Sequence, residues 1–312
     1  MIKVEHLSKV YGNRVAVWDL SFDLKKGEIL GFLGPNGAGK TTTMRMITGF
    51  IPPSSGTATV AGYDIAEEPL KVKGEIGYLC EAPPVYREMS VKSYLKFVAR
   101  LKKVPRSRMN HCLDRALQLC GLEDVAGRVI GNLSKGYRQR VGLAQAIIHK
   151  PAVLILDEPT VGLDPRQIRD IRSLITELSG EQTVILSTHI LPEVTVTCSR
   201  VIIISEGQVV AEDTVEGLTE GLSKSETMTL RVERTPEGFQ GALAALDQVV
   251  DVAVESPNRF QVRLEGGDAT RALLANTVVR SGAGLLEMAR STATLEEVFL
   301  KLVTEEPEGE VA

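Results

Sequence analysis

The amino-acid sequence predicts an α/β domain with a buried parallel sheet, followed by a smaller α+β domain. Short apolar runs at 28–33, 152–156 and 183–187 have strand character and are separated by segments of helical periodicity, which is typical of buried parallel sheets. Around 220–226, glycine and serine residues interrupt the apolar periodicity, and a different order of elements follows. A chain of 312 residues is long enough for two such domains.

The first domain is predicted to span 1–222 and to contain a helical subdomain at about 85–140. A helix is expected at 40–48, directly behind the first buried strand. Further along, apolar residues recur at helical spacing behind Ser90, which can serve as an N-cap, and another helix is expected at 108–119. The middle of this domain is therefore expected to be helical.

The second domain is predicted to span 223–312. Its strands are expected at 227–232, 249–254, 260–264 and 285–289, and its helices at 236–246 and 269–280. This βαββαβ order is typical of a ferredoxin-like unit. A last helix at 295–303 precedes an acidic tail at 305–310, which we expect to be solvated.

The composition narrows the class of protein. Hydrophobic residues make up 43% and charged residues 24%, the usual mixture of a soluble globular protein. A net charge of −4 and the lack of a run of Lys and Arg argue against a protein that binds nucleic acid. No apolar run approaches the roughly 18 to 20 residues that cross a bilayer, and the first residues do not resemble a secretory signal, so we expect a cytoplasmic location. Four cysteines without a Cys-x-x-Cys pair are expected to be buried thiols.

The clearest chemical signal is the segment 34–41, Gly-Pro-Asn-Gly-Ala-Gly-Lys-Thr, which fits G-x-x-x-x-G-K-[ST] between a strand and a helix. Its backbone N–H groups and the charge of Lys40 can surround phosphate oxygens, and the Thr41 hydroxyl can hold Mg²⁺. A glycine-rich turn without function is the less favoured interpretation. The segment therefore predicts a P-loop NTPase that binds a nucleoside triphosphate and Mg²⁺ through Asn36, Gly37, Ala38, Gly39, Lys40, Thr41 and Thr42.

A second signal is the apolar strand at 153–156, which ends in two carboxylates, Asp157 and Glu158. Asp157 is placed to orient Mg²⁺, and Glu158 to act on the water that attacks the γ-phosphate. A solvated strand end is the alternative, and the P-loop in the same chain disfavours it.

From residue 1 to about 220, the chain resembles the ATP-binding cassette (ABC) family. The resemblance rests on Leu-Ser-Lys-Gly-Tyr at 133–137, which stands before the Asp157-Glu158 strand in the order of that family. It implies a head-to-tail dimer in which Ser134 and Gly136 of one subunit contact the nucleotide held by the P-loop of another. Lys135 stands where the family has glycine, and Tyr137 where it has glutamine.

The resemblance also implies roles for isolated residues. Tyr11 stands where the family stacks a ring on adenine, Asp164 in its D-loop, and His189 at its switch histidine. A histidine alone is more often structural, but this one follows a strand that reaches the same sheet edge. Glu81 replaces the usual Q-loop glutamine, and its carboxylate could ligate Mg²⁺. The implied catalytic residues are Glu158 and His189, and the implied metal ligands are Thr41, Glu81 and Asp157.

By resemblance, the function is that of an ATPase subunit that drives a separate transmembrane permease from the inner face of the cell membrane. Residues 81–101 would face that permease. Glu81, the variant signature and the C-terminal extension together resemble ABC-2-type exporters, including the gliding-motility and antibiotic-resistance branches. The dimer could be a homodimer or a heterodimer of two cassettes.

Three alternatives stay open at this point. A regulatory cassette would bind ATP without hydrolysing it, as Glu81 and Lys135 could indicate. A soluble relative would act on ribosomes or DNA, although the chain has one P-loop and no sustained heptads. A P-loop kinase would share the phosphate site but not the signature or His189.

Overall fold

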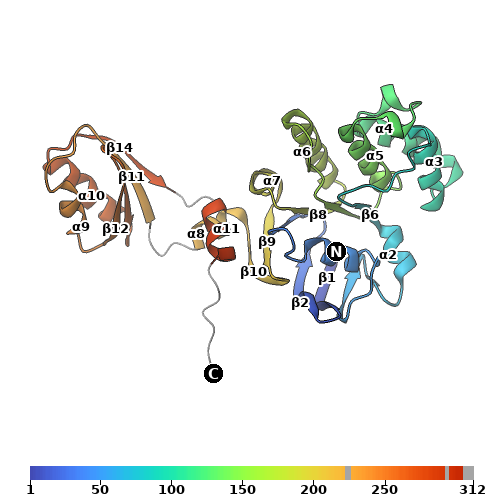
Figure 1. Cartoon of the computed structure of the whole chain (residues 1–312), viewed down its shortest axis with the longest axis horizontal. Coiled ribbons are helices and arrows are strands. Elements are labelled where there is room, and N and C mark those ends of the chain that lie inside the picture. Colours follow the sequence, from blue (N-terminus) through green and yellow to red (C-terminus); the bar gives the residue numbers. More distant parts are fainter. Residues whose placement is uncertain (222–225, 292–294, 305–312) are drawn as a thin grey trace. The chain divides into compact units, whose positions relative to one another are not determined.

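The computed structural model describes residues 1–221, 226–291 and 295–304. The chain divides into two compact units, Met1–Val215 and Glu216–Ala312 (Figure 1). The boundary predicted between residues 222 and 223 and the acidic tail predicted at 305–310 lie outside the described residues.

A six-stranded sheet forms the centre of the first unit, in the order β10-β9-β3-β8-β7-β6. Its strands are β3 (Ile29–Leu33), β6 (Ile76–Leu79), β7 (Val153–Asp157), β8 (Thr183–Thr188), β9 (Arg200–Ser205) and β10 (Gln208–Asp213). All pairs are parallel except β9 with β10, so the predicted α/β class is confirmed. Because β3, β8 and β7 are neighbours, the segments that follow them meet at one edge of the sheet.

A second, antiparallel sheet was not predicted. It contains β1 (Ile2–Tyr11), β2 (Arg14–Leu24), β4 (Ser55–Val60) and β5 (Tyr63–Asp64). The pairing of β1 with β2 shifts register three times, which breaks the simple alternation that reveals a strand. Phe22 of this sheet packs against Phe32 of β3, with ring centroids 5.8 Å apart. Trp18 in β2 is 52% exposed and therefore contributes less to the core than expected for a large apolar residue.

The helices of the first unit are α1 (Lys40–Ile47), α2 (Pro69–Glu75), α3 (Val91–Leu101), α4 (Met109–Leu119), α5 (Lys135–Ile147), α6 (Pro165–Ser179) and α7 (Leu191–Thr197). Helices α3 and α4 lie within the predicted subdomain, whereas α5 begins in it and extends beyond 140. The three helices stand together (Figure 1) and share one hydrophobic core. Ser90 caps α3 as expected, since its Oγ accepts from Ser93 N at 3.3 Å.

The second unit has the βαββαβ order that the sequence predicts. After α8 (Val215–Gly221) it contains β11 (Glu226–Val232), α9 (Phe239–Ala244), β12 (Val249–Ser256), β13 (Arg259–Leu264), α10 (Asp268–Arg280), β14 (Leu285–Ser291) and α11 (Leu295–Thr304). The sheet order is β12-β13-β11-β14 with antiparallel pairs, as in ferredoxin-like units. Helix α9 is shorter than the predicted 236–246 because Gly238 adopts φ 76°, a left-handed conformation that cannot continue a helix.

Two further expectations concern cysteines and membrane spans. Cys112 and Cys120 are buried as predicted, whereas Cys80 and Cys198 are partly exposed, and all four are free thiols. Among the helices of the described residues, none has the length and apolar character needed to span a bilayer.

Candidate nucleotide site

The loop between β3 and α1 owes its shape to glycines. Gly39, the N-cap of α1, has φ 103°, and a Cβ at this position would lie 2.7 Å from the carbonyl oxygen of Ala16. Gly37 also has a positive φ, 86°. No other residue type adopts these conformations without strain, so the glycines allow the backbone to fold around an anion at the helix N-terminus.

Lys40 directs its charge into this loop. Its side chain is 6% exposed, and Nζ donates to the carbonyl oxygens of Gly34 at 2.7 Å and Pro35 at 3.1 Å. Nζ also lies 3.6 Å from Oε1 of Glu158. Burial lowers the pKa of Lys40, and the negative charges of Glu158 and Asp157 oppose this shift. The result is a cation held in position at the loop.

Asp157, at the end of β7, is fully buried. Its Oδ1 accepts from Ser187 Oγ of the neighbouring strand at 2.9 Å, and within the described residues its Oδ2 has no hydrogen-bond partner. Burial raises the pKa of Asp157, while the Ser187 hydrogen bond lowers it. A buried oxygen without a partner fits a Mg²⁺ ligand, with the Thr41 hydroxyl as a second. In the described part of the chain, no group of three acidic, His or Cys side chains has an arrangement that could hold a metal ion. A Mg²⁺ ion here would take its other oxygen ligands from phosphate and water.

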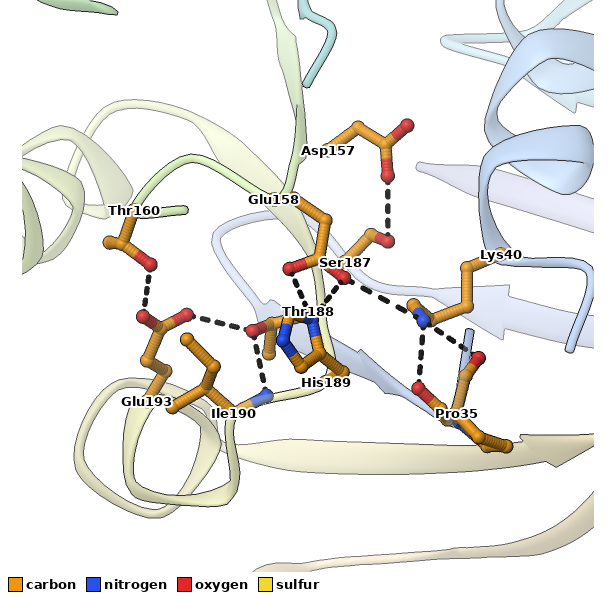
Figure 2. Close-up of polar contacts among 11 residues, drawn as sticks. Pro35, Lys40, Asp157, Glu158, Thr160, Ser187, Thr188, His189, Ile190 and Glu193 are labelled. Carbon is orange, nitrogen blue, oxygen red and sulfur yellow. Dashed lines mark hydrogen bonds and ion pairs between the residues drawn. The ribbon is translucent and has the colours of Figure 1, made fainter. Parts of the chain in front are cut away.

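Glu158 follows directly but turns away from the strand. Its φ of 51° is unusual for a residue with a side chain, and its N–H donates to the Ser187 carbonyl at 2.9 Å. As Figure 2 shows, both carboxylate oxygens lie 2.9 Å from Nδ1 of His189, which follows β8. Strained backbones of this kind concentrate at functional sites. The strand end thus presents two carboxylates to different partners.

A buried contact that the sequence analysis missed connects the same two loops. Glu193, in the first turn of α7, is 1% exposed. Its Oε1 accepts from Thr160 Oγ1 and its Oε2 from Thr188 Oγ1, the latter at 2.8 Å (Figure 2). Thr188 Oγ1 in turn accepts from Ile190 N at 3.0 Å. Glu193 therefore holds the segment after Glu158 and the segment around His189 together.

The glycine loop and the ends of strands β7 and β8 border a cavity of about 790 Å³. Its lining includes the predicted residues Tyr11, Asn36, Gly37, Gly39, Lys40, Thr41, Thr42, Glu81, Glu158 and His189. Arg14, Ala16 and Val161 also line it, and the sequence analysis missed them. Arg14 pairs with Tyr11 across the β1–β2 hairpin, and Ala16 lies two residues further along β2 on the same face. Ala38 packs in the hydrophobic core instead of lining the cavity, and Asp157 is likewise absent from the lining.

Ser134, Gly136 and Asp164 do not line the cavity of their own chain. Ser134 Oγ caps α5 by accepting from Tyr137 N at 3.3 Å, and Asp164 Oδ1 caps α6 with two hydrogen bonds of 3.0 Å. A Cβ on Gly136 would lie 2.5 Å from Oε1 of Gln167, so a larger residue there would require the Gln167 side chain to move. Their predicted ligand is the nucleotide of a second copy, and that contact stays a prediction.

Comparison with known proteins identifies the family. The family model described as ABC transporter matches residues 17–161. The chain is 33% identical to the uncharacterized ABC transporter ATP-binding protein YxlF of Bacillus subtilis, over 97% of this chain and 99% of that protein. The chain belongs to the ABC transporter family. It is an ATP-binding subunit, and its first unit carries the ATPase domain of the family.

Other ABC relatives are similar over nearly the whole chain. The linearmycin resistance ATP-binding protein LnrL of Bacillus subtilis is 33% identical, over 97% of this chain and 98% of that protein. The bacitracin transport ATP-binding protein BcrA of Bacillus licheniformis is 32% identical over 97% of each. A solved ABC transporter ATP-binding subunit aligns with TM-score 0.66 and 29% identity, over 71% of this chain and 92% of that one. Membership of the ABC family does not support the alternative of a P-loop kinase.

Proposed function

We propose that this ABC subunit hydrolyses ATP with Mg²⁺ and thereby drives a separate transmembrane permease that exports its substrate. The observation that carries the proposal is the position of the Glu158 carboxylate, between His189 and Lys40 at the mouth of the glycine loop. This arrangement brings a proton acceptor and a phosphate-binding cation into one cavity.

Binding of ATP follows from the loop. The backbone N–H groups of residues 36–42 and Lys40 Nζ are the donors for the β- and γ-phosphates, and the exposed ring of Tyr11 is the surface for the adenine. Asp157 and Thr41 would hold Mg²⁺, with Glu81 adding negative charge nearby. When bound, Mg²⁺ neutralises charge that develops on the phosphate oxygens.

Hydrolysis depends on Glu158. Phosphate oxygens compete with its carboxylate for Lys40, so an occupied loop leaves Glu158 to accept the proton of the attacking water. His189 Nδ1 fixes the orientation of that carboxylate from the neighbouring strand end. Glu158 is therefore the catalytic base, and His189 the residue that positions it and senses the γ-phosphate.

Transport needs a second cassette and a membrane partner. Ser134 and Gly136 of another cassette would cover the nucleotide, in a homodimer or a heterodimer, and ATP binding would draw the two cassettes together. The names of LnrL and BcrA, a resistance protein and a transport protein, support an exporter. The subunit would then work at the inner face of the cell membrane, attached through its permease.

The test is Glu158→Gln, compared with Glu177→Gln, an exposed carboxylate on α6 outside the cavity. We expect Glu158→Gln to keep ATP affinity, to lower hydrolysis by about 10²- to 10⁴-fold, and to accumulate an ATP-bound dimer. Phosphate release and size-exclusion chromatography with ATP measure both effects. Wild-type turnover in this variant would remove Glu158 from its role, and co-purification of the chain with ribosomes instead of membranes would contradict the transport function.

A further inference from the structure

A groove on the helical subdomain is lined by basic side chains that the nucleotide site does not use. Helix α3 contributes Lys96 and Arg100, and the short 3₁₀ helix η1 (Arg106–Arg108) contributes Arg106. The groove has a volume of about 590 Å³ and is completed by Val104, Met109 and Asn110. None of these residues lines the nucleotide cavity.

The surrounding segment is strongly basic although the chain as a whole is acidic. Residues 90–113 contain seven Lys and Arg and no Asp or Glu. These basic residues are not consecutive, so they form no charge run in the sequence. Lys92, Lys96 and Arg100 recur every fourth position, and this spacing places them on one side of a helix. The helix thus creates a patch that a search for charge runs overlooks.

The cations that line the groove differ in their pairing from other arginines of the first unit. Within the described residues, Lys96, Arg100 and Arg106 form no ion pair, whereas Arg115 on α4 pairs with Glu181 at 2.9 Å and Arg140 on α5 pairs with Asp170 at 2.8 Å. Like charges that converge without neutralisation raise the local positive potential, and an anion relieves their repulsion.

We propose that this basic groove binds the phosphate groups of anionic phospholipids on the membrane that holds the permease. Arginine binds phosphate through paired hydrogen bonds, and lysine binds it as a point charge. Leu101, next to Arg100, is 65% exposed, and an apolar side chain among cations suits the boundary between headgroups and acyl chains. The inference rests on the proposed function, because a permease partner brings the subunit to an anionic membrane surface.

The test compares the full-length wild type with Lys96→Gln/Arg100→Gln/Arg106→Gln. The control is Lys25→Gln/Lys26→Gln/Lys150→Gln, which removes the same charge from exposed positions elsewhere on the unit. Each protein is mixed without nucleotide with vesicles of phosphatidylcholine alone or with 30% phosphatidylglycerol, and the bound fraction is measured by flotation. Thermal unfolding and ATP hydrolysis are measured in parallel to verify that both variants fold.

We expect the wild type to float with the anionic vesicles only, and less so as salt rises. Each cation near a charged surface raises the membrane affinity about fivefold, so the groove variant should bind the anionic vesicles roughly 100-fold more weakly. The affinity of the control variant should change little beyond the general effect of its lower charge. Equal losses in both variants would overturn the proposal. So would displacement by inorganic phosphate at the concentration of lipid phosphate, or groove-dependent binding to a DNA duplex without binding to vesicles. A wild type that floats with anionic vesicles but hydrolyses no ATP in the parallel assay would refute the proposed function and leave the lipid contact standing.

Discussion

Removal of the Glu193 carboxylate should destabilise the protein and slow ATP hydrolysis together. Glu193, Thr160 and Thr188 are exposed by only 1%, 2% and 0%, and each carboxylate oxygen accepts one threonine hydroxyl. A hydrogen bond to such a group contributes about 1.5 to 3 kcal/mol, so Glu193→Ala should lower the free energy of unfolding by about 3 to 6 kcal/mol. Glu193→Gln keeps one acceptor oxygen and should cost about half as much.

The kinetic effect follows from what the two threonines adjoin. Thr188 precedes His189, and Thr160 lies two residues after Glu158. Because a displacement of about 1 Å can cost 10²-fold in rate, we expect kcat of Glu193→Gln to fall about 10- to 100-fold. The Kd for ATP should not change, since Lys40 and the glycine loop are untouched. Urea unfolding followed by circular dichroism and phosphate release measure the two effects.

A double-mutant cycle separates this contact from general destabilisation. Thr188→Val removes the hydroxyl while keeping the side-chain volume. The loss of unfolding free energy in the double variant with Glu193→Ala should be smaller than the sum of the two single losses by about 1 kcal/mol or more. Additive effects of the two substitutions, or an Ala variant with wild-type urea midpoint and turnover, would show that Glu193 does not hold the two loops together.

Two further predictions concern pH and metal dependence. Burial, and then the charge of Lys102, lower the pKa of His149 from 6.5 to about 4, so between these values the unfolded chain binds a proton that the folded chain does not. Stability should therefore fall as the pH falls from 6.5 toward 4, and His149→Gln should remove about 2 to 3 kcal/mol of this dependence in urea titrations. Matching pH profiles of stability for His149→Gln and wild type would contradict the reasoning. Glu81→Gln removes one negative charge from the nucleotide cavity, so the Mg²⁺ concentration that half-saturates hydrolysis should rise about two- to fivefold; superimposable Mg²⁺ titrations would argue against any role of this carboxylate in metal binding.

The parts of the site that are contiguous in sequence could be predicted, because their chemistry is local. The loop at 34–41 carries its glycines, lysine and threonine in one motif, and Asp157 with Glu158 ends a recognisable apolar strand. The sheet order then brings these segments and His189 to one edge, which the alternation of strands and helices already indicates.

What the sequence did not reveal depends on contacts between distant segments. Glu193 lies in an ordinary helical turn, and only the fold brings Thr160, 33 residues away, to its carboxylate. Arg14 lines the cavity because the β1–β2 hairpin places it opposite Tyr11. The basic groove is hidden in the sequence for a related reason. Its charges form no continuous run, because the helix brings together residues that are four positions apart.

Strand β2 offers a spectroscopic handle on nucleotide occupancy. Arg14 and Ala16 line the cavity, and Trp18, two residues further along the same strand and half exposed to solvent, is the single tryptophan of the protein. Its indole emission can be excited selectively, so a titration with unlabelled ATP in a fluorimeter would report the filling of the site in the native chain. Variants such as Glu158→Gln could then be ranked by affinity without any turnover.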